Sequence, residues 1–140
     1  MRSIDILGKV LEYESWGVSW KADPRHRKMI IDHFGFNDKT QAVTVTGLKE
    51  EPSRGGEILL NPVEAPQFRA IAARFNYLAA DCPKLQFATK EVCREMSAPT
   101  VRSHEKMKRL ARYLMNVREV KLYYRWPDDI TDLCVCVCRF

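Results

Sequence analysis

Two groups of cationic side chains are the residues of this chain best suited to binding chemistry. They are Arg25, Arg27 and Lys28 in one group and Lys106, Lys108, Arg109 and Arg112 in the other. Between Arg102 and Arg125, eight lysines and arginines stand against two glutamates, whereas the whole chain has a formal net charge of +5. Such a cluster is the electrostatic footprint of a protein that binds polyanions through phosphate contacts, which read no base sequence. A solvated helix face would carry the same charges, so that interpretation stays open.

Three of the five cysteines, Cys134, Cys136 and Cys138, alternate along one predicted strand. Alternating residues share one face of a strand, from which three thiolates cannot surround one ion tetrahedrally without a bend. No Cys-x-x-Cys pair or nearby histidine completes a metal site. We therefore interpret these cysteines as structural thiols of a half-buried strand, with metal binding or redox chemistry as the alternative.

The other residue types that catalysis uses are scattered along the chain. His26 and His33 lie seven residues apart on one helix stripe and His104 is distant from both, so packing is the favoured role for them. Asp128 and Asp129 follow a proline in a turn, where solvated carboxylates are more typical than a two-metal site. Neither a Ser-His-Asp spacing nor a glycine-rich phosphate loop is present. We assign no catalytic residue, no metal ligand and no cofactor to this chain.

Length and composition favour a single intracellular domain. A chain of 140 residues is long enough to bury a hydrophobic core. An odd number of cysteines and the lack of a secretory signal at residues 1–10 favour a reduced compartment, the cytoplasm or the nucleus. Because no apolar run approaches the ~18 residues that a membrane span requires, we expect no membrane association.

The pattern of apolar residues predicts an α+β fold that is mostly helical. It begins with a hairpin of two strands at residues 4–11 and 17–21, joined by a turn at Tyr13–Trp16. Gly8 lies within the first of these strands, where the missing side chain allows another backbone to approach closely. A helix then starts at Asp23-Pro24 and ends before Gly35. Its inward stripe is expected to consist of His26, Met29, Ile30, His33 and Phe34.

Residues 37–65 lack a clear period and are predicted to form a tether. A connection of this length is usually a functional loop or a link between sub-domains. A short hairpin between residues 43–45 and 58–60 is one option for its structure. Asn61 begins a capped turn, and Pro66 would clash with a continuous helix, so we expect that turn to be separate from the next helix.

Three helices with two short joints are predicted from Gln67 to Val117. The first has an apolar stripe with the helical period, formed by Phe68, Ile71, Ala72, Phe75, Leu78 and Ala79. The second starts at Pro83, and its inward residues are Leu85, Ala88, Val92 and Met96. The third is capped by Thr100, and its inward residues are Met107, Leu110, Ala111 and Leu114. Alternating residues at 120–126 and 133–140 predict strands after these helices.

Several of these segments resemble copia-type retrotransposon reverse transcriptases. The likeness is carried by Ile6-Leu7-Gly8 with its returning strand, Asp23-Pro-Arg-His26, Gln67–Leu78, Asp81–Ala88 and Lys108–Leu114. It covers roughly residues 4–133. The blocks Ala73–Ala88 and Lys108–Leu114 are specific in combination, although each piece alone is weak.

The resemblance implies a fragment of a reverse transcriptase that binds nucleic acid. Residues 1–22 would be the primer-grip hairpin at the end of the palm, with Leu7 and Gly8 at the primer. The helix at 23–36 and the tether at 37–65 would lead to the thumb and connection helices at 66–118. Residues 119–140 would begin an RNase H-like domain. The implied partners are an RNA/DNA or DNA duplex, as template and primer, and the rest of a Pol polyprotein.

Both active sites of that family are missing from this chain. The Val-Asp-Asp motif of the polymerase should precede Ile4, and the first RNase H aspartate should fall near Cys138, where cysteine cannot ligate magnesium as an aspartate does. Mg²⁺ is thus expected only for the missing catalytic segments, and the chain alone is expected to be inactive. Thr46 replaces the usual proline of the family, which loosens the tether. Two alternatives remain, a decayed pseudogene product without function and a helical protein-interaction module.

Overall fold

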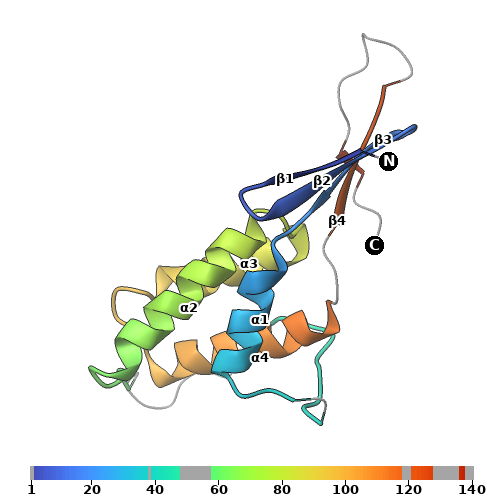
Figure 1. Ribbon diagram of the computed structural model, residues 1–140. Helices are drawn as coiled ribbons and strands as arrows, with labels where there is room; N and C mark the ends of the chain where they lie inside the picture. The colour runs from blue at the N-terminus through green and yellow to red at the C-terminus, as the bar shows by residue number, and fades with distance from the viewer. Residues whose placement is uncertain (1, 38, 48–57, 118–120, 128–135, 138–140) are drawn as a thin grey trace.

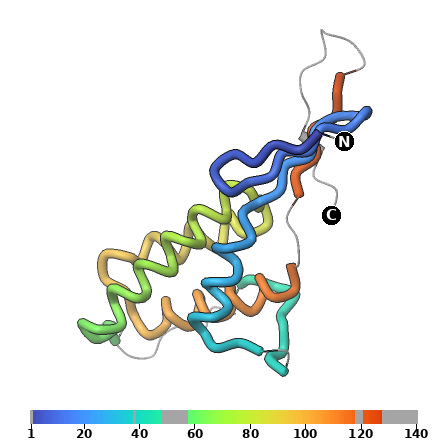
Figure 2. The backbone as a smooth tube through the Cα atoms, viewed as in Figure 1, coloured from blue at the N-terminus to red at the C-terminus, as the bar shows by residue number. Residues whose placement is uncertain are grey.

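The computed structural model describes residues 2–37, 39–47, 58–117, 121–127 and 136–137, and these residues form a mostly helical α+β fold, as the sequence predicts (Figure 1). The strands are β1 (Arg2–Ile6), β2 (Lys9–Glu14), β3 (Gly17–Lys21), β4 (Lys121–Arg125) and β5 (Cys136–Val137). The helices are α1 (Pro24–His33), α2 (Glu64–Ala79), α3 (Pro83–Arg94) and α4 (Val101–Asn116). The sheet projects from one end of the helical bundle (Figure 2).

The four helices pack around one apolar core. Helix α1 packs on α2 and α4, and α3 packs on the same two helices, so α1 and α3 stand at diagonal corners of the bundle. The predicted stripes of α2 and α4 are fully buried, because their apolar residues recur with the period of the helix. The core consists of Ile30, Phe68, Ile71, Ala72, Phe75, Leu78, Ala79, Cys82, Leu85, Val92, Met107, Leu110, Ala111 and Leu114.

The predicted stripe of α1 is wrong in part. Ile30 is buried and His26 and Phe34 are half-buried, but Met29 and His33 are exposed. Helix α1 is a corner of the bundle and contributes Ile30 alone to the buried core, so the margins of its apolar stripe reach solvent. On α3 the predicted stripe holds, with Thr89 as an additional buried residue.

Side chains cap the helices where the sequence predicts caps. The Asp23 carboxylate accepts a hydrogen bond from the backbone N–H of Arg25 at 2.9 Å, and Gly35 follows the last turn of α1 with a φ of +62°. Thr100 and Ser103 form a reciprocal capping box at the start of α4, in which Thr100 Oγ1 accepts from the Ser103 N–H at 3.1 Å. Local chemistry therefore sets these boundaries.

Helix α2 begins at Glu64, so the expectation of a separate turn before Pro66 is wrong. Pro66 lies in the first helical turn, where an N–H group has no partner within the helix and its loss costs nothing. The side chain of Asn61 still acts as a cap, because its Oδ1 accepts hydrogen bonds from the N–H groups of Val63 at 3.0 Å and Glu64 at 2.7 Å.

The N-terminal strands form a three-stranded meander and not the predicted two-stranded hairpin. Residues 4–11 do not form one strand, because Leu7 and Gly8 have φ values of +54° and +77° and form a two-residue turn between β1 and β2. These values suit the type I′ turn, whose twist matches that of the flanking strands. Side chains, and not another backbone, lie closest to Gly8, which corrects the expected role of this glycine.

Strand β4 pairs with β3, so the two ends of the described chain meet in one antiparallel sheet of order β1-β2-β3-β4-β5. On one sheet face the Glu12 carboxylate contacts the ammonium groups of Lys21 at 2.8 Å and Lys121 at 3.5 Å, and accepts from Ser19 Oγ at 3.1 Å. The hydrogen bond from Lys21 lowers the pKa of Glu12. Salt bridges between neighbouring strands therefore hold the side chains on this face.

The opposite sheet face is mostly apolar, although Arg2 and Lys9 also lie on it, and it is partly open to solvent. Alternation and register place Ile4, Ile6, Tyr13 and Tyr124 on this face, and all four are exposed. In the described part of the chain the helices meet only one end of the sheet (Figure 1). The fold therefore leaves a patch of apolar side chains unburied.

The hairpin that was one option for residues 43–45 and 58–60 is not formed by these described residues. Leu59 instead forms an isolated antiparallel bridge with Thr100, and the Val43 N–H donates to the Arg112 carbonyl at 3.4 Å. Predictions for Asp128, Asp129 and the side chains of Cys134, Cys136 and Cys138 lie outside the described residues.

Candidate nucleic-acid interface

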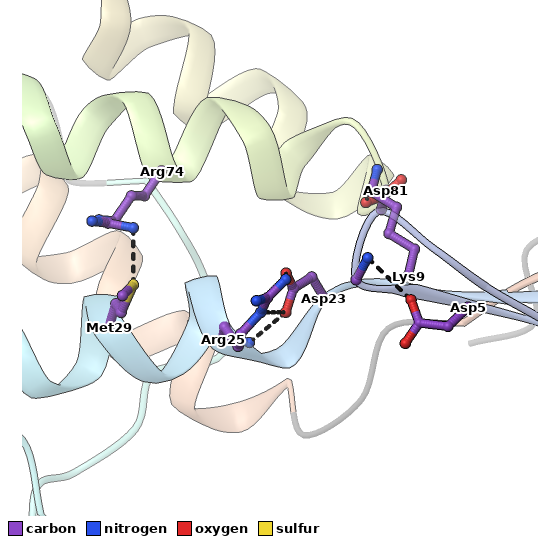
Figure 3. Close-up of polar contacts among 8 residues, drawn as sticks. Asp5, Lys9, Asp23, Arg25, Met29, Arg74 and Asp81 are labelled. Carbon is purple, nitrogen blue, oxygen red and sulfur yellow. Dashed lines mark hydrogen bonds and ion pairs between the residues drawn. The ribbon is translucent and has the colours of Figure 1, made fainter.

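The tip of the β1–β2 hairpin is the first part of the predicted interface. The Leu7 side chain is 84% exposed, and the Gly8 N–H donates to Asp5 Oδ1 at 3.1 Å. A Cβ atom added at Gly8 would lie 2.7 Å from Asp23 Oδ2 and would also clash with the Arg25 guanidinium. The hairpin tip therefore rests directly on the first turn of α1 (Figure 3).

Arg25 is bound to Asp23 in the same place. Its Nη2 donates to Asp23 Oδ2 at 2.8 Å and its Nε donates to Asp23 Oδ1 at 3.1 Å. The hydrogen bond from Arg25 lowers the pKa of Asp23, although burial acts in the opposite direction. Since 72% of the Arg25 side chain is exposed, the outer edge of the guanidinium remains open to a ligand.

The structure brings together the three cationic residues predicted on α1. They line an open hollow of about 400 Å³, together with Pro24, Ile31 and Asp32. Arg27 also has a structural role, because its Nε donates to the Val117 carbonyl at 2.9 Å and its Nη2 to the Met115 carbonyl at 3.2 Å. Arg27 thus caps the C-terminal end of α4 with a positive charge. Lys28 is exposed at the edge of the hollow.

The cationic residues of α4 do not form one surface. Lys106 binds the Glu95 carboxylate at 2.5 Å and lies about 200° around the helix from Lys108, which is exposed. The Nε of Arg112 donates to the Gln41 carbonyl at 2.8 Å, so this side chain holds the segment 39–47 against α4. Arg109 Nε is buried and has no hydrogen-bond partner among the described residues.

A polar junction between the sheet and the bundle was missed by sequence reasoning. The buried Asp81 carboxylate forms an ion pair with Lys9 Nζ at 2.7 Å, and Figure 3 shows both side chains. It also accepts a hydrogen bond from Trp20 Nε1 at 3.1 Å. The Lys9 ammonium also lies 5.5 Å from the ring centre of Trp20 and 4.9 Å from that of Tyr77, within the range of cation–π attraction. His26 packs against Tyr77, with ring centres 4.3 Å apart.

No local signal in the sequence could have revealed this junction, because its members are separated by up to 72 positions and come from β2, β3, α2 and the joint after α2. The junction adjoins the predicted interface in the chain, because Lys9 directly follows Gly8 of the hairpin tip. The junction therefore fixes how the hairpin tip sits above α1.

Cys82 and Cys93 are poorly suited to nucleophilic chemistry. Burial raises the pKa of the thiols of Cys82 and Cys93, which disfavours the nucleophilic thiolate. In the described ranges, no cluster of three or more His, Cys, Asp or Glu residues could hold a metal ion. None of the described helices is long and apolar enough to cross a membrane.

Comparisons with known proteins neither support nor contradict this interface. Searches of protein-family models, of curated proteins and of solved structures all give no match to this chain. The likeness to copia-type reverse transcriptases therefore rests on the residues of this sequence alone.

Proposed function

We propose that this chain binds the phosphate backbone of a nucleic-acid duplex as the thumb and connection segment of a copia-type reverse transcriptase, without either active site. Its proposed partners are an RNA/DNA or DNA template–primer and the rest of a Pol polyprotein. The observation that supports this function best is the hollow on α1, where three cationic side chains meet directly beside the exposed hairpin tip.

The chemistry of the hollow suits phosphate groups. Arg25 presents the open edge of a guanidinium that Asp23 already holds in place, so little side-chain entropy is lost when a phosphate binds. Lys28 adds a mobile charge at the same hollow, and Lys108 and Arg109 would provide a second contact from α4. These groups address phosphates and not base edges, so the binding would be independent of sequence.

The apolar face of the sheet favours a protein partner in addition. Ile4, Ile6, Tyr13 and Tyr124 are exposed on it, and an apolar surface of this kind typically marks a site of protein association. This observation supports the rest of the polyprotein as a partner, and it is also the observation that would support a protein-interaction module.

Titration of the full chain with a labelled RNA/DNA hybrid at several salt concentrations tests the duplex proposal. Each phosphate contact contributes about 0.9 to the slope of log K against log salt, so Arg25→Ala with Lys28→Ala should reduce the slope by about 2. Lys106→Ala is the matched control, because Glu95 already neutralises Lys106, and it should leave the slope unchanged. Equal slopes for all three proteins would refute the assignment of the hollow.

A polymerase assay with magnesium tests the proposed lack of catalysis. We expect duplex binding without nucleotide incorporation. Robust DNA synthesis by the purified chain would overturn the proposal of a non-catalytic segment.

A further inference from the structure

Strand β1 is an open edge of the described sheet, and the duplex proposal does not use it. All of its residues are exposed, and in the order of the described strands it has a neighbour on one side, β2. The β1–β2 register is continuous, so no bulge bends this edge, and the strand contains neither lysine nor proline. Edge strands usually carry such features, because an open edge otherwise pairs with a strand of another molecule. Strand β1 is therefore suited to pairing with another chain.

The backbone groups of Ser3 and Asp5 point away from β2. Ile6 and Lys9 flank the two-residue turn, and the residues that flank such a turn form a hydrogen-bonded pair. Hydrogen-bonded pairs alternate along an antiparallel ladder, so the backbone of Ile4 also faces β2. The N–H and C=O groups of Ser3 and Asp5 are therefore directed to the open side of the sheet.

We propose that β1 pairs antiparallel with β1 of a second copy of this chain, with Ile4 opposite Ile4 on a two-fold axis. In this register Ser3 faces Asp5 of the second copy, and the two residues can exchange both of their N–H···O bonds. The Ser3 hydroxyl also faces the Asp5 carboxylate, to which it can donate. A shift of two residues would instead place Asp5 opposite Asp5, where like charges repel, or Ser3 opposite Ser3, which leaves Asp5 without a partner strand. The register centred on Ile4 uses both residues at once.

The apolar side chains of β1 fit the same register. A two-fold axis normal to the sheet keeps its faces, so the apolar faces of the two copies become continuous. Ile6 of the second copy then lies opposite Arg2, beside an open hollow of about 630 Å³ that is lined by Arg2, Ser3, Ile4 and Tyr13. Ile4 and Ile6 are 48% and 43% exposed in the single chain, so the pairing would remove apolar surface from water.

The helical bundle does not obstruct this pairing. Strand β1 runs from the end of the sheet that lies away from the helices to the hairpin tip at α1 (Figure 1). An antiparallel partner therefore has its bundle at the opposite end of the joined sheet. At the far edge of the described sheet lies a different strand, β5, so the self-pairing of β1 closes at a dimer.

Sedimentation velocity of the full chain without nucleic acid, at about 1–500 μM, tests the pairing. Two short strands bury less surface than the roughly 1,200 Å² of a stable complex, so we expect a dissociation constant on the order of 10–100 μM. Ile4→Lys and Ile4→Glu each place like charges opposite each other on the axis and should weaken association at least about 10-fold. An equimolar mixture of these two variants should associate again, because opposite charges then meet.

Val63→Lys is the matched control, because it makes the same change of charge at an exposed apolar residue of the bundle, and it should leave association unchanged. Ser3→Pro tests the backbone pairing. It removes an N–H that points to the open side, so the β1–β2 ladder stays intact while association should weaken at least about 5-fold. Ser3→Ala should associate like the original protein.

A monomer at every concentration would overturn the proposal and leave β1 to an extended strand of a different protein. A dimer that persists in Ile4→Lys, or an assembly larger than a dimer, would also overturn it. Circular dichroism confirms that each variant is folded, since β1 is exposed and contributes no residue to the buried core. The duplex proposal is tested by salt slopes with a hybrid, so the two proposals can fail independently of each other.

Discussion

The ion pair between Lys9 and Asp81 should couple the sheet to the helical bundle. The two side chains are 14% and 8% exposed, and their charged atoms lie 2.7 Å apart. Removal of one partner from a buried pair typically costs 3–5 kcal/mol, because the other charge is left without compensation. Lys9→Met would leave the Asp81 carboxylate with Trp20 Nε1 as its remaining hydrogen-bond donor, so we expect a loss of about 3 kcal/mol of unfolding free energy.

The reverse substitution should cost less. Asp81→Asn keeps an acceptor for Trp20, and the stranded Lys9 ammonium would still face the rings of Trp20 and Tyr77. That attraction offsets about 0.5–2 kcal/mol of the cost of breaking the ion pair, so we expect a loss of about 2 kcal/mol of unfolding free energy. The double variant contains neither charge and should lose about 2–3 kcal/mol, and not the ~5 kcal/mol that the two losses would give if they were independent.

Urea denaturation of the four proteins measures this coupling. All three tryptophans, Trp16, Trp20 and Trp126, lie in or beside the sheet, so fluorescence reports on the sheet while far-ultraviolet circular dichroism is dominated by the helices. We expect the fluorescence transition to precede the dichroism transition in the single variants, as the sheet separates first.

Lys106→Met, which breaks a more exposed pair with Glu95, is the control and should cost less than about 1 kcal/mol. If the losses of the two single variants add to within about 0.5 kcal/mol in the double variant, the pair does not join the sheet to the bundle and the reasoning is wrong.

Two further predictions concern the first turn of α1. Gly8→Ala should destabilise the protein by about 1–3 kcal/mol, because the new side chain is strained at a positive φ and also clashes with Asp23 and Arg25. Gly35→Ala is the control, since its new Cβ meets no atom within 4 Å, and it should cost about 1 kcal/mol; equal losses in thermal denaturation would argue against the contact at the hairpin tip. Acid should weaken the fold through Asp23, whose folded-state pKa is lowered by Arg25: this stabilisation is present above the unfolded-state value of about 4 and is lost as the pH falls through the folded-state pKa. Asp23→Asn keeps the cap, so its stability should fall less steeply between about pH 5 and pH 2, and an unchanged acid profile would contradict this role.

Local patterns in the sequence were sufficient for most of the helical bundle. The stripe from Phe68 to Ala79 and the caps at Asp23 and Thr100 are set by contacts within a few residues, and the structure confirms them. Local rules failed where two of them competed. At Leu7-Gly8 the β-rich composition predicted one long strand, but turn chemistry prevailed, and at Pro66 the rule against helical proline does not apply to the first turn.

The candidate nucleic-acid interface was likewise predictable from the sequence only in part. The sequence alone determined that Arg25, Arg27 and Lys28 are cationic and lie within one helix turn. Their common hollow does not follow from this spacing, because Arg25 and Arg27 lie about 200° apart around the helix. Only the tertiary structure decided which of these charges are already engaged, because Arg27 reaches the end of α4 and Lys106 reaches Glu95. Pairing of β3 with β4 and the junction at Asp81 likewise join residues far apart in the chain. Contacts of this kind depend on how whole elements pack, which no periodicity within a single element can encode.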